Sequence, residues 1–275
     1  MKPEDRELVA QLCAARSGQK VDPAKDYLLE TRLGPVARRE GFDSIGDLMA
    51  GLRARREDRL IWAIVEAMAA GDTSFFRDRA AFDYFRDVLA PELAHRRKDQ
   101  PIRIWSAACG TGQEIHSLAM LVDDMAGQWP EARFELFGSD LSERALEKAQ
   151  TGLYTQFEVQ RGLPIRSLVR HFEKVDEMWA ISPQIRQAIR WRRLNLIGDM
   201  SRVRGFDLVF CRNVIGSMIE PAQRQVVENL AAALNPGGKV LFGSGEDPVA
   251  GAEPLVPVDD APGLYALRSA DRAAA

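Results

Sequence analysis

The segment RIWSAACGTGQEIHSLAM, residues 103–120, constrains the fold more than any other part of the sequence. An apolar run ends in small residues, the turn Gly110-Thr111-Gly112 follows, and a helical pattern begins directly after it. Such a strand–turn–helix unit is typical of parallel α/β sheets, which bind ligands at the carboxyl ends of their strands. Glycines let the backbone approach a ligand closely, and a helix start offers free N–H groups. The segment therefore predicts a ligand-binding loop, with a tight connection that binds nothing as the alternative.

The rest of the chain after about residue 100 continues the same alternation. Strands are predicted over 102–108, 134–140, 206–213 and 239–245, and helices over 114–128, 141–152 and 221–234. Ser142 is expected as the N-cap of the second of these helices, and Gly152 stands just past its end. A turn is predicted at 235–238, and GLYALR at 263–268 is expected as an antiparallel edge strand. Strands that alternate with helices indicate a parallel sheet with helices on both faces.

Three regions follow from these patterns. Residues 1–70 show only helical patterns, with Gly41 as a stop and Ser44 as an N-cap, and predict an all-helical N-terminal domain. Residues 71–100 are expected to form a linker and a connecting helix, and residues 101–275 the sheet domain. Within it, residues from about 153 to 196 break the alternation and are expected to form a small β-rich insertion. The Ala-rich tail after Arg268 is expected to be disordered.

Composition and charge exclude several classes of protein. A net charge of −3 and a pI near 5.8 do not suit a protein that coats itself with nucleic acid. No apolar run approaches the roughly 20 residues that span a bilayer, and the N-terminus lacks the apolar core of a signal peptide. The three cysteines are widely spaced, without a CxxC pair, and there are only three histidines. We therefore expect no metal site, and free thiols in a reducing cytoplasm.

The loop and its surroundings indicate which ligand binds. The dinucleotide fingerprint G-x-G-x-x-G would need glycine where Ile115 stands, and no P-loop lysine follows. Glu114 would repel a pyrophosphate but suits a ligand with an ammonium group. Asp140 ends the second predicted strand, where it can accept hydrogen bonds from ribose hydroxyls. A nucleoside that carries a cationic amino acid, S-adenosylmethionine, satisfies both requirements.

Together with GDTSFFRD at 71–78, RRLNLIGD at 192–199 and FDLVFCRNVIG at 206–216, this pattern resembles the chemotaxis receptor methyltransferases, the CheR family, over nearly the whole chain. The resemblance implies a class I S-adenosylmethionine-dependent methyltransferase fold. It comprises a Rossmann-like α/β sheet domain with a small inserted β-subdomain, preceded by an all-α N-terminal domain. The implied activity is transfer of the methyl group to glutamate side chains of chemoreceptors, the methyl-accepting chemotaxis proteins. The products are glutamyl methyl esters and S-adenosylhomocysteine.

The resemblance also implies site residues. Arg77 is the expected catalytic residue, because an arginine can position a carboxylate by paired hydrogen bonds. Glu114 is implied to contact the methionine amino group and Asp140 the ribose. The full set implied to bind the cofactor is Thr73, Arg77, Gly110, Gly112, Glu114, Asp140, Asn195, Leu196, Asn213 and Val214.

Three departures from the family pattern leave alternatives open. Gly71 stands where the family usually has Asn, and Gly110 where it has Ser. The stretch 216–218, Gly-Ser-Met, replaces one that carries a Tyr near the reacting methyl in the family. The second hypothesis is therefore a catalytically weak S-adenosylmethionine-binding signalling protein with an altered substrate. A nucleic-acid methyltransferase lacks its N/D-P-P-Y/F motif here, and a small-molecule O-methyltransferase leaves the basic helical region unexplained.

Basic residues in the first region suggest a partner surface. They cluster as Arg32, Arg38 and Arg39, and as Arg53, Arg55, Arg56 and Arg59. Basic helices can meet an acidic receptor bundle, whereas a solvated face is the alternative; the resemblance favours the cytoplasmic helical bundle of chemoreceptors. Some family members bind a receptor pentapeptide on the inserted subdomain by strand addition. Here the hairpin around KVDEM, 174–178, is short and lacks glycine, so we expect no pentapeptide tether. We also expect a monomer that neither binds nucleic acid nor inserts into membranes.

Three residues near the loop are expected to have structural roles only. His116 is expected to be a polar histidine on a helix face, because a glutamate carboxylate needs no general base. Cys109 and Cys211 end predicted strands in apolar company and are expected to be small core residues rather than nucleophiles.

Overall fold

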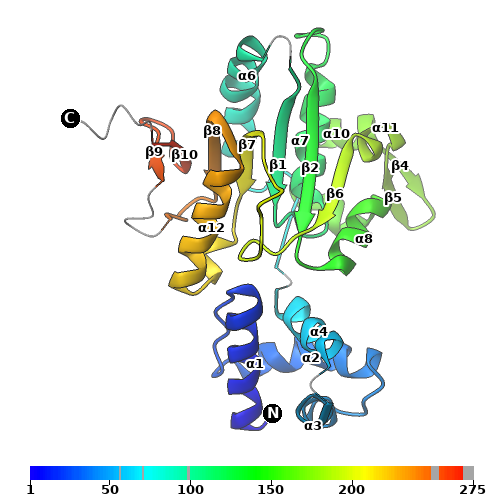
Figure 1. The fold of residues 1–275 in the computed structure, drawn as a ribbon. Coiled ribbons are helices and arrows are strands. Elements are labelled where there is room, and N and C mark those ends of the chain that lie inside the picture. Colours follow the sequence, from blue (N-terminus) through cyan, green and yellow to red (C-terminus); the bar gives the residue numbers. More distant parts are fainter. Residues whose placement is uncertain (56, 70, 98–99, 249–253, 269–275) are drawn as a thin grey trace.

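The computed structural model describes residues 1–55, 57–69, 71–97, 100–248 and 254–268. Arg56 and the tail after Arg268, where disorder is expected, lie outside these ranges. Figure 1 shows a small group of helices at the bottom of the view and a helix-flanked sheet above it. None of the helices in the described ranges is long and apolar enough to cross a bilayer.

The N-terminal region is helical, as its sequence pattern predicts. Its helices are α1 (Pro3–Ser17), α2 (Asp26–Arg39), α3 (Ile45–Arg55) and α4 (Asp58–Ala69). Gly41, with a φ of 81°, lies in the turn after α2. Ser44 Oγ accepts a hydrogen bond from the Asp47 N–H at 3.1 Å and so caps α3 as expected. Val9 and Ile64 belong to the apolar cluster that these helices share. The boundaries of the three predicted domains stay predictions.

A connecting helix leads from this region to the sheet. It consists of α5 (Arg79–Tyr84), one stretch of π-helix, η1 (Phe85–Leu89), and α6 (Ala90–Arg96).

The central sheet has seven strands among the described residues. Their spatial order is β6 (Ile189–Arg193), β2 (Phe134–Asp140), β1 (Ile102–Ala107), β7 (Phe206–Cys211), β8 (Leu234–Phe242), β10 (Leu264–Leu267) and β9 (Leu255–Pro257). Neighbours from β6 to β8 are parallel, whereas β10 is antiparallel to both β8 and β9. The predicted parallel sheet is therefore confirmed.

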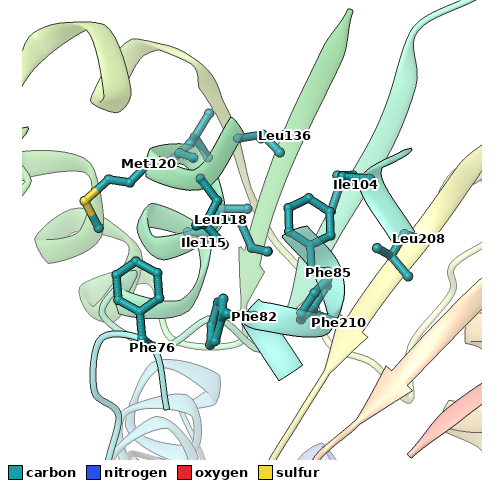
Figure 2. Packing of buried hydrophobic residues seen from close by; sticks show 14 of the residues in the cluster. Phe76, Phe82, Phe85, Ile104, Ile115, Leu118, Met120, Leu136, Leu208 and Phe210 are labelled. Atoms are coloured by element: carbon teal, nitrogen blue, oxygen red, sulfur yellow. The ribbon is translucent and has the colours of Figure 1, made fainter. Parts of the chain in front are cut away.

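Helices cover both faces of this sheet. Successive side chains of a strand point to opposite faces, so each strand contributes to two cores. On β1, Ile104 faces the core formed with α7 (Gln113–Met125) and the connecting helix, whereas Trp105 faces the core formed with α12 (Glu220–Ala233). Figure 2 shows the first of these cores, with side chains from the connecting helix, α7 and three strands: Phe82, Phe85, Ile115, Leu118, Ile104, Leu136, Leu208 and Phe210.

The helix after β2 begins and ends as its sequence predicts. In α8 (Glu143–Thr151) the Ser142 Oγ accepts a hydrogen bond from the Ala145 N–H at 3.2 Å. Gly152, with a φ of 63°, ends the helix in the left-handed conformation.

The insertion follows α8 and is shorter than expected. It contains β3 (Leu153–Thr155), α9 (Gln156–Gln160), α10 (Ile165–His171), β4 (Phe172–Val175) and β5 (Met178–Ile181), followed by α11 (Pro183–Gln187). The three strands form a separate antiparallel sheet in the order β3-β5-β4. The expected upper limit near residue 196 is wrong, because β6 pairs in parallel with β2 and belongs to the central sheet. The mixed polarity of β6 misled the prediction: it is an edge strand whose arginines reach solvent.

Two details at the other side of the sheet also differ from expectation. The predicted turn at 235–238 is part of β8, where the register with β7 jumps from Phe206–Leu234 to Leu208–Lys239. The predicted antiparallel strand forms as β10, but it is not the edge, because β9 pairs with its outer side. β9 is a short strand that lacks a strong apolar alternation.

Candidate functional site

A cavity of about 250 Å³ opens at the carboxyl ends of β1, β2, β6 and β7. Nine of the ten residues expected to bind the cofactor line it: Thr73, Arg77, Gly110, Glu114, Asp140, Asn195, Leu196, Asn213 and Val214. Gly112 does not. The structure therefore gathers into one place residues that lie up to about 140 positions apart in the chain.

The glycine turn after β1 shows why Gly112 differs from Gly110. Both have positive φ, 56° at Gly110 and 93° at Gly112. A Cβ on Gly110 would meet nothing nearer than Thr73 at 3.7 Å, on the cavity side. A Cβ on Gly112 would come within 2.8 Å of the Ala149 Cβ and 3.1 Å of the Tyr154 hydroxyl. Gly112 therefore permits close packing against α8 behind the loop, rather than contact with a ligand.

Glu114 lies in the first turn of α7, where a carboxylate is favoured by the helix dipole. Its Oε1 accepts a hydrogen bond from the Ser106 hydroxyl at 2.8 Å, and its Oε2 from Arg212 Nη1 at 3.1 Å. Burial raises the pKa of Glu114, and the Arg212 guanidinium and the Ser106 hydroxyl offset part of that increase. A cationic group in the cavity would favour the charged carboxylate further.

Asp140 ends β2 and ties the glycine loop to the neighbouring strand. Its Oδ2 accepts the Gly110 N–H at 2.8 Å, and its Oδ1 accepts the Ser142 N–H at 2.9 Å. Burial raises the pKa of Asp140, while these backbone hydrogen bonds lower it. Each oxygen of a carboxylate can accept more than one hydrogen bond, so Asp140 can also take a hydroxyl from a ligand.

Arg212, which the sequence analysis did not single out, joins the opposite walls of the cavity. It follows β7 and is 5% exposed. Its guanidinium pairs with Glu114, and also donates to Asp78 Oδ2 at 2.9 Å and to the carbonyl of Arg77 at 2.7 Å. The sequence does carry a signal for this residue, because a charge directly after a buried strand lies at the ligand edge of a parallel sheet.

The linker before the connecting helix forms a second wall. Arg77 Nη1 donates to the Asp72 carbonyl at 2.7 Å, and Arg77 has no carboxylate within 4.0 Å among the described residues. The Asp72 carboxylate instead pairs with Arg161 of the insertion, at 2.6 and 2.5 Å. Phe76 and Asp78 have positive φ, 47° and 53°, which is strained for residues with a side chain.

The N-terminal helices supply a third wall that the sequence analysis missed. Ser17, Gln19, Arg32 and Met68 line the cavity. The Oε1 atom of Gln19 is buried and has no hydrogen-bond partner among the described residues. No local signal marks these residues, because their place depends on how the helical region packs against the sheet.

Backbone and side-chain hydrogen bonds fix that packing. Lys20 N–H donates to the Ser217 carbonyl, and Ile219 N–H to the Gly18 carbonyl, each at 2.8 Å. Asn195 Nδ2 donates to the carbonyl of Arg16 at 2.7 Å. The amide of Asn195, expected beside a nucleobase, is thus engaged in holding α1.

The loop after β7 is shaped by Glu246, another residue without a predicted role. Its carboxylate accepts backbone N–H groups from Asn213, from Gly216 at 3.0 Å and from Gly243 at 3.1 Å. The stretch 215–217 forms a single turn of 3₁₀-helix, η2 (Ile215–Ser217). Ser217 lines the cavity, but its hydroxyl donates to the Val214 carbonyl at 2.7 Å.

His116 is not on a polar helix face, and that expectation is wrong. Its side chain is fully buried, and its Nδ1 lies 2.7 Å from the Tyr154 hydroxyl. The rings of Tyr154, on β3 of the insertion, and of Trp191, on β6, pack against its imidazole edge to face. Cys109 and Cys211 are buried core residues, as predicted.

One group of possible metal ligands lies away from the cavity. Asp123, Asp124 and His171 place one ligand atom each within 4.8 Å of one another. Arg170 already pairs with both carboxylates, at 3.6 and 3.0 Å, so the negative charge there has a partner.

The large cavity fits S-adenosylmethionine on observations of this structure. Glu114 and Asp140 present carboxylates to it, as an ammonium group and ribose hydroxyls require. The unpartnered Oε1 of Gln19 is a buried acceptor that needs a donor, and the adenosyl group carries an amino group and hydroxyls. The bare backbone at Gly110 leaves room for close approach.

The chain is similar to a known family and to several known proteins. The family described as "CheR methyltransferase, SAM binding domain" matches residues 71–254. Chemotaxis protein methyltransferase 1 of Pseudomonas aeruginosa is 34% identical over 227 residues, which cover 81% of this chain and 82% of that protein. Chemotaxis protein methyltransferase Cher2 of Pseudomonas putida is 32% identical over the same shares. Among solved structures, a TehB-like SAM-dependent methyltransferase from Corynebacterium glutamicum is 17% identical, with a TM-score of 0.36, over 70% of this chain and 96% of that one.

Proposed function

The chain belongs to the CheR methyltransferase family, and from that premise we propose that it methylates glutamate side chains of chemoreceptors. Membership makes it an S-adenosylmethionine-dependent methyltransferase of chemotaxis. The proposal adds the substrate: the reaction is an O-methylation in the cytoplasm, by a monomer, that yields glutamyl methyl esters.

The observation that carries the proposal is the position of Arg77. Arg77 lines the same cavity as Glu114 and Asp140, yet it has no carboxylate partner among the described residues. An arginine in this state can take the carboxylate of an incoming glutamate by paired hydrogen bonds. Glu114 and Asp140 form their hydrogen bonds with groups other than the Arg77 side chain. The Arg77 guanidinium therefore remains available to the carboxylate of the substrate.

Few further groups are needed for the chemistry. When bound, S-adenosylmethionine supplies a methyl group on a positively charged sulfur. A glutamate carboxylate, with an ordinary pKa of about 4.3, is ionised at pH 7 and accepts a methyl group without a general base. The residues of the cavity therefore act by holding and aligning: Glu114 the ammonium group, Asp140 the ribose hydroxyls, and Arg77 the substrate. Such alignment can supply on the order of 7–11 kcal/mol of a barrier.

The receptor is proposed to approach along the N-terminal helices, although several of the predicted basic residues are already paired. Arg53 pairs with Asp5 at 2.5 Å, and Arg39 with Glu40 at 3.0 Å. Arg32 lines the cavity instead of the outer surface. Because fewer arginines remain unpaired on these helices, we favour a local receptor contact near Arg38 over a broad electrostatic surface. We retain the prediction that no receptor pentapeptide binds the insertion.

The proposal is tested by transfer of labelled methyl groups from S-adenosylmethionine to receptor helices. Receptors with glutamate at the modified positions should gain label that alkali releases as methanol, and receptors with glutamine there should not. Arg77→Ala should lower kcat about 100-fold, because a misaligned carboxylate loses its in-line approach. Arg79→Ala, an exposed arginine two positions along, is the control. Full transfer by Arg77→Ala would show that Arg77 has no such role.

One observation favours a second candidate function, that of a catalytically weak signalling protein that binds S-adenosylmethionine. Ser217 and Met218 line the cavity where the family's Tyr is expected, and the Ser217 hydroxyl is engaged with Val214. Binding of S-adenosylhomocysteine without any methyl transfer would support this candidate. If the chain is an active methyltransferase, Ser217→Tyr changes the rate of a methyl transfer that the unmodified chain already catalyses. If the chain is the weak enzyme, Ser217→Tyr introduces methyl transfer.

A further inference from the structure

A second cavity, of about 200 Å³, lies on the face of the sheet formed by β1, β2 and β6. It is on the side that carries α12, but α12 packs over β8 and leaves this part of the sheet to the connection between β6 and β7. That connection, 194–205, is irregular among the described residues and is drawn as a loop in Figure 1. The cavity adjoins the cofactor cavity at Leu194, which lines both.

The walls of this second cavity carry a charge of one sign. Five arginines line it, Arg103, Arg190, Arg192, Arg202 and Arg204, and no acidic residue does among the described residues. Glu135, which is not part of the lining, pairs with Arg103 at 3.7 Å and with Arg190 at 3.6 Å. Guanidinium groups gathered around one hollow repel one another and raise the local concentration of anions.

Two of these arginines have no partner in the part of the chain that the structure describes. Arg192 and Arg202 are exposed, and neither side chain makes a hydrogen bond or ion pair with a described residue. Arg192 projects from the edge strand β6, two residues beyond Arg190 and on the same face of the sheet. Unpaired guanidinium groups that face a hollow from a strand and from a loop suit a phosphate group, which accepts paired hydrogen bonds from arginine.

The other side of the cavity offers flat surfaces. The Arg103 guanidinium lies over the Phe137 ring at 4.7 Å and over the Phe206 ring at 4.8 Å, and Arg190 lies over Phe137 at 5.5 Å. A guanidinium plane already supported by an aromatic ring can stack a planar base on its outer side. A phosphate site beside such a stack matches a nucleotide better than a simple anion.

The volume of the cavity and the net charge of the chain narrow the choice of ligand further. The cavity is slightly smaller than the one assigned to S-adenosylmethionine, about 200 against about 250 Å³, and so suits a single nucleotide. The chain as a whole is acidic, with a net charge of −3, which does not favour a long nucleic acid running over its surface.

We propose that this cavity is a second ligand site, which binds a nucleoside monophosphate. Its base stacks on the exposed guanidinium of Arg190, which lies over Phe137, and its phosphate pairs with Arg192 and Arg202. The site does not depend on the identity of the methyl acceptor.

The test uses the full chain saturated with S-adenosylhomocysteine, so that the cofactor cavity is filled and cannot take the probe. AMP, GMP, CMP and UMP are titrated separately by calorimetry, alongside the corresponding nucleosides, inorganic phosphate, hexaglutamate and octauridylate. At least one mononucleotide should bind more tightly than its nucleoside and than phosphate.

Variants then locate the site. Arg192→Ala combined with Arg202→Ala should weaken mononucleotide binding at least tenfold, while binding of S-adenosylhomocysteine stays unchanged and shows that the variant folds. Arg166→Ala removes another exposed, unpaired arginine outside this cavity and should have no effect.

Three outcomes would overturn the proposal. The first is that no mononucleotide binds. The second is that phosphate, hexaglutamate or octauridylate binds at least as tightly as every mononucleotide. The third is that the Arg166 control loses as much affinity as the double variant.

Discussion

At the scale of single residues, the hydrogen bonds of His116 define its protonation. The Tyr154 hydroxyl donates to the Thr111 carbonyl at 2.9 Å, so its oxygen is free to accept from His116. The proton of the neutral ring is therefore on Nδ1, and Nε2 is a buried acceptor without a partner among the described residues. Burial lowers the pKa of His116 to about 3, because a second proton would place an unpaired charge in the core.

This histidine makes stability depend on pH. Between its ordinary pKa of 6.5 and the folded value of about 3, the unfolded chain binds a proton that the folded chain does not. The contribution of His116 to the free energy of unfolding is fully present above its ordinary pKa of 6.5 and is lost as the pH falls. The loss is about 2 kcal/mol between pH 7 and pH 5. His116→Gln, which can still bond to Tyr154, should lose about 2 kcal/mol less over that range in urea unfolding. His95→Gln, at an exposed position, should follow the unmodified chain.

Comparing the two histidine variants removes the effect of the acids in the cavity. Glu114 and Asp140 have raised pKa values, so they hold protons more readily in the folded chain and oppose the trend at low pH. Both are present in every variant and cancel in the difference. Identical pH profiles for His116→Gln and the unmodified chain would contradict the buried neutral histidine.

Glu114 should determine affinity for the cofactor through its charge. Glu114→Gln keeps the shape of the side chain but removes the carboxylate that an ammonium group would meet. A hydrogen bond between charged groups contributes about 1.5–3 kcal/mol, so S-adenosylhomocysteine should bind roughly 10- to 100-fold more weakly in calorimetry. Glu143→Gln, also in the first turn of a helix but exposed, is the matched control. Unchanged affinity in Glu114→Gln would show that the amino group binds elsewhere.

At the scale of elements, the two glycines of the turn after β1 should respond differently to substitution. Gly110→Ala adds a Cβ into open space and costs about 1 kcal/mol for its left-handed conformation. Gly112→Ala adds the same strain and a clash with the backbone of α8, where the Ala149 Cα lies at 3.2 Å. We expect a cost of about 3 kcal/mol or more there. Urea unfolding without cofactor measures both, and equal losses would contradict the assigned packing.

The elements that the sequence predicted are those with local signals. The cap at Ser142 and the stop at Gly152 depend on neighbours within one turn, and both form as predicted. β7 is buried along its whole length, so it reads as a nearly continuous apolar run. β6 lacks that signal because one of its faces is open, and β9 is too short to show any pattern.

The same distinction applies to the candidate site. Asp140, at the end of a strand, and Glu114, in the helix that follows one, could be predicted because a parallel sheet brings the carboxyl ends of its strands together. Gln19 could not, because it reaches the cavity only through the docking of α1 on the loop before α12. Arg212 carries a local signal, as the charged residue directly after β7, but its contacts with Glu114 and with the Arg77 carbonyl form only on folding.

At the scale of the whole molecule, the helical region and the sheet share one cavity. The contacts between them include Arg193 with Glu66 at 2.6 Å and the backbone bridge between Gln19 and Met218. A ligand in this cavity contacts both parts and should stabilise their junction.

Hydrogen exchange tests this shared cavity. Addition of S-adenosylhomocysteine should slow exchange of amides in residues 14–20 and 215–219 as well as in the glycine turn, because opening the junction would expose the ligand. The second half of α3, residues 50–55, does not line the cavity, so it serves as the internal reference and should not change. Protection confined to residues 106–114 and 140–142 would mean that the helical region does not close the site.

The backbone bridge between Gln19 and Met218 also limits how such a molecule can diverge. Helices proposed to meet the receptor supply a wall for the methyl donor, so replacing them with those of a relative would leave that wall ill-fitting. A change in the receptor-binding helices therefore also changes the binding site of the methyl donor. An active chimera would need matching substitutions on both sides of this contact.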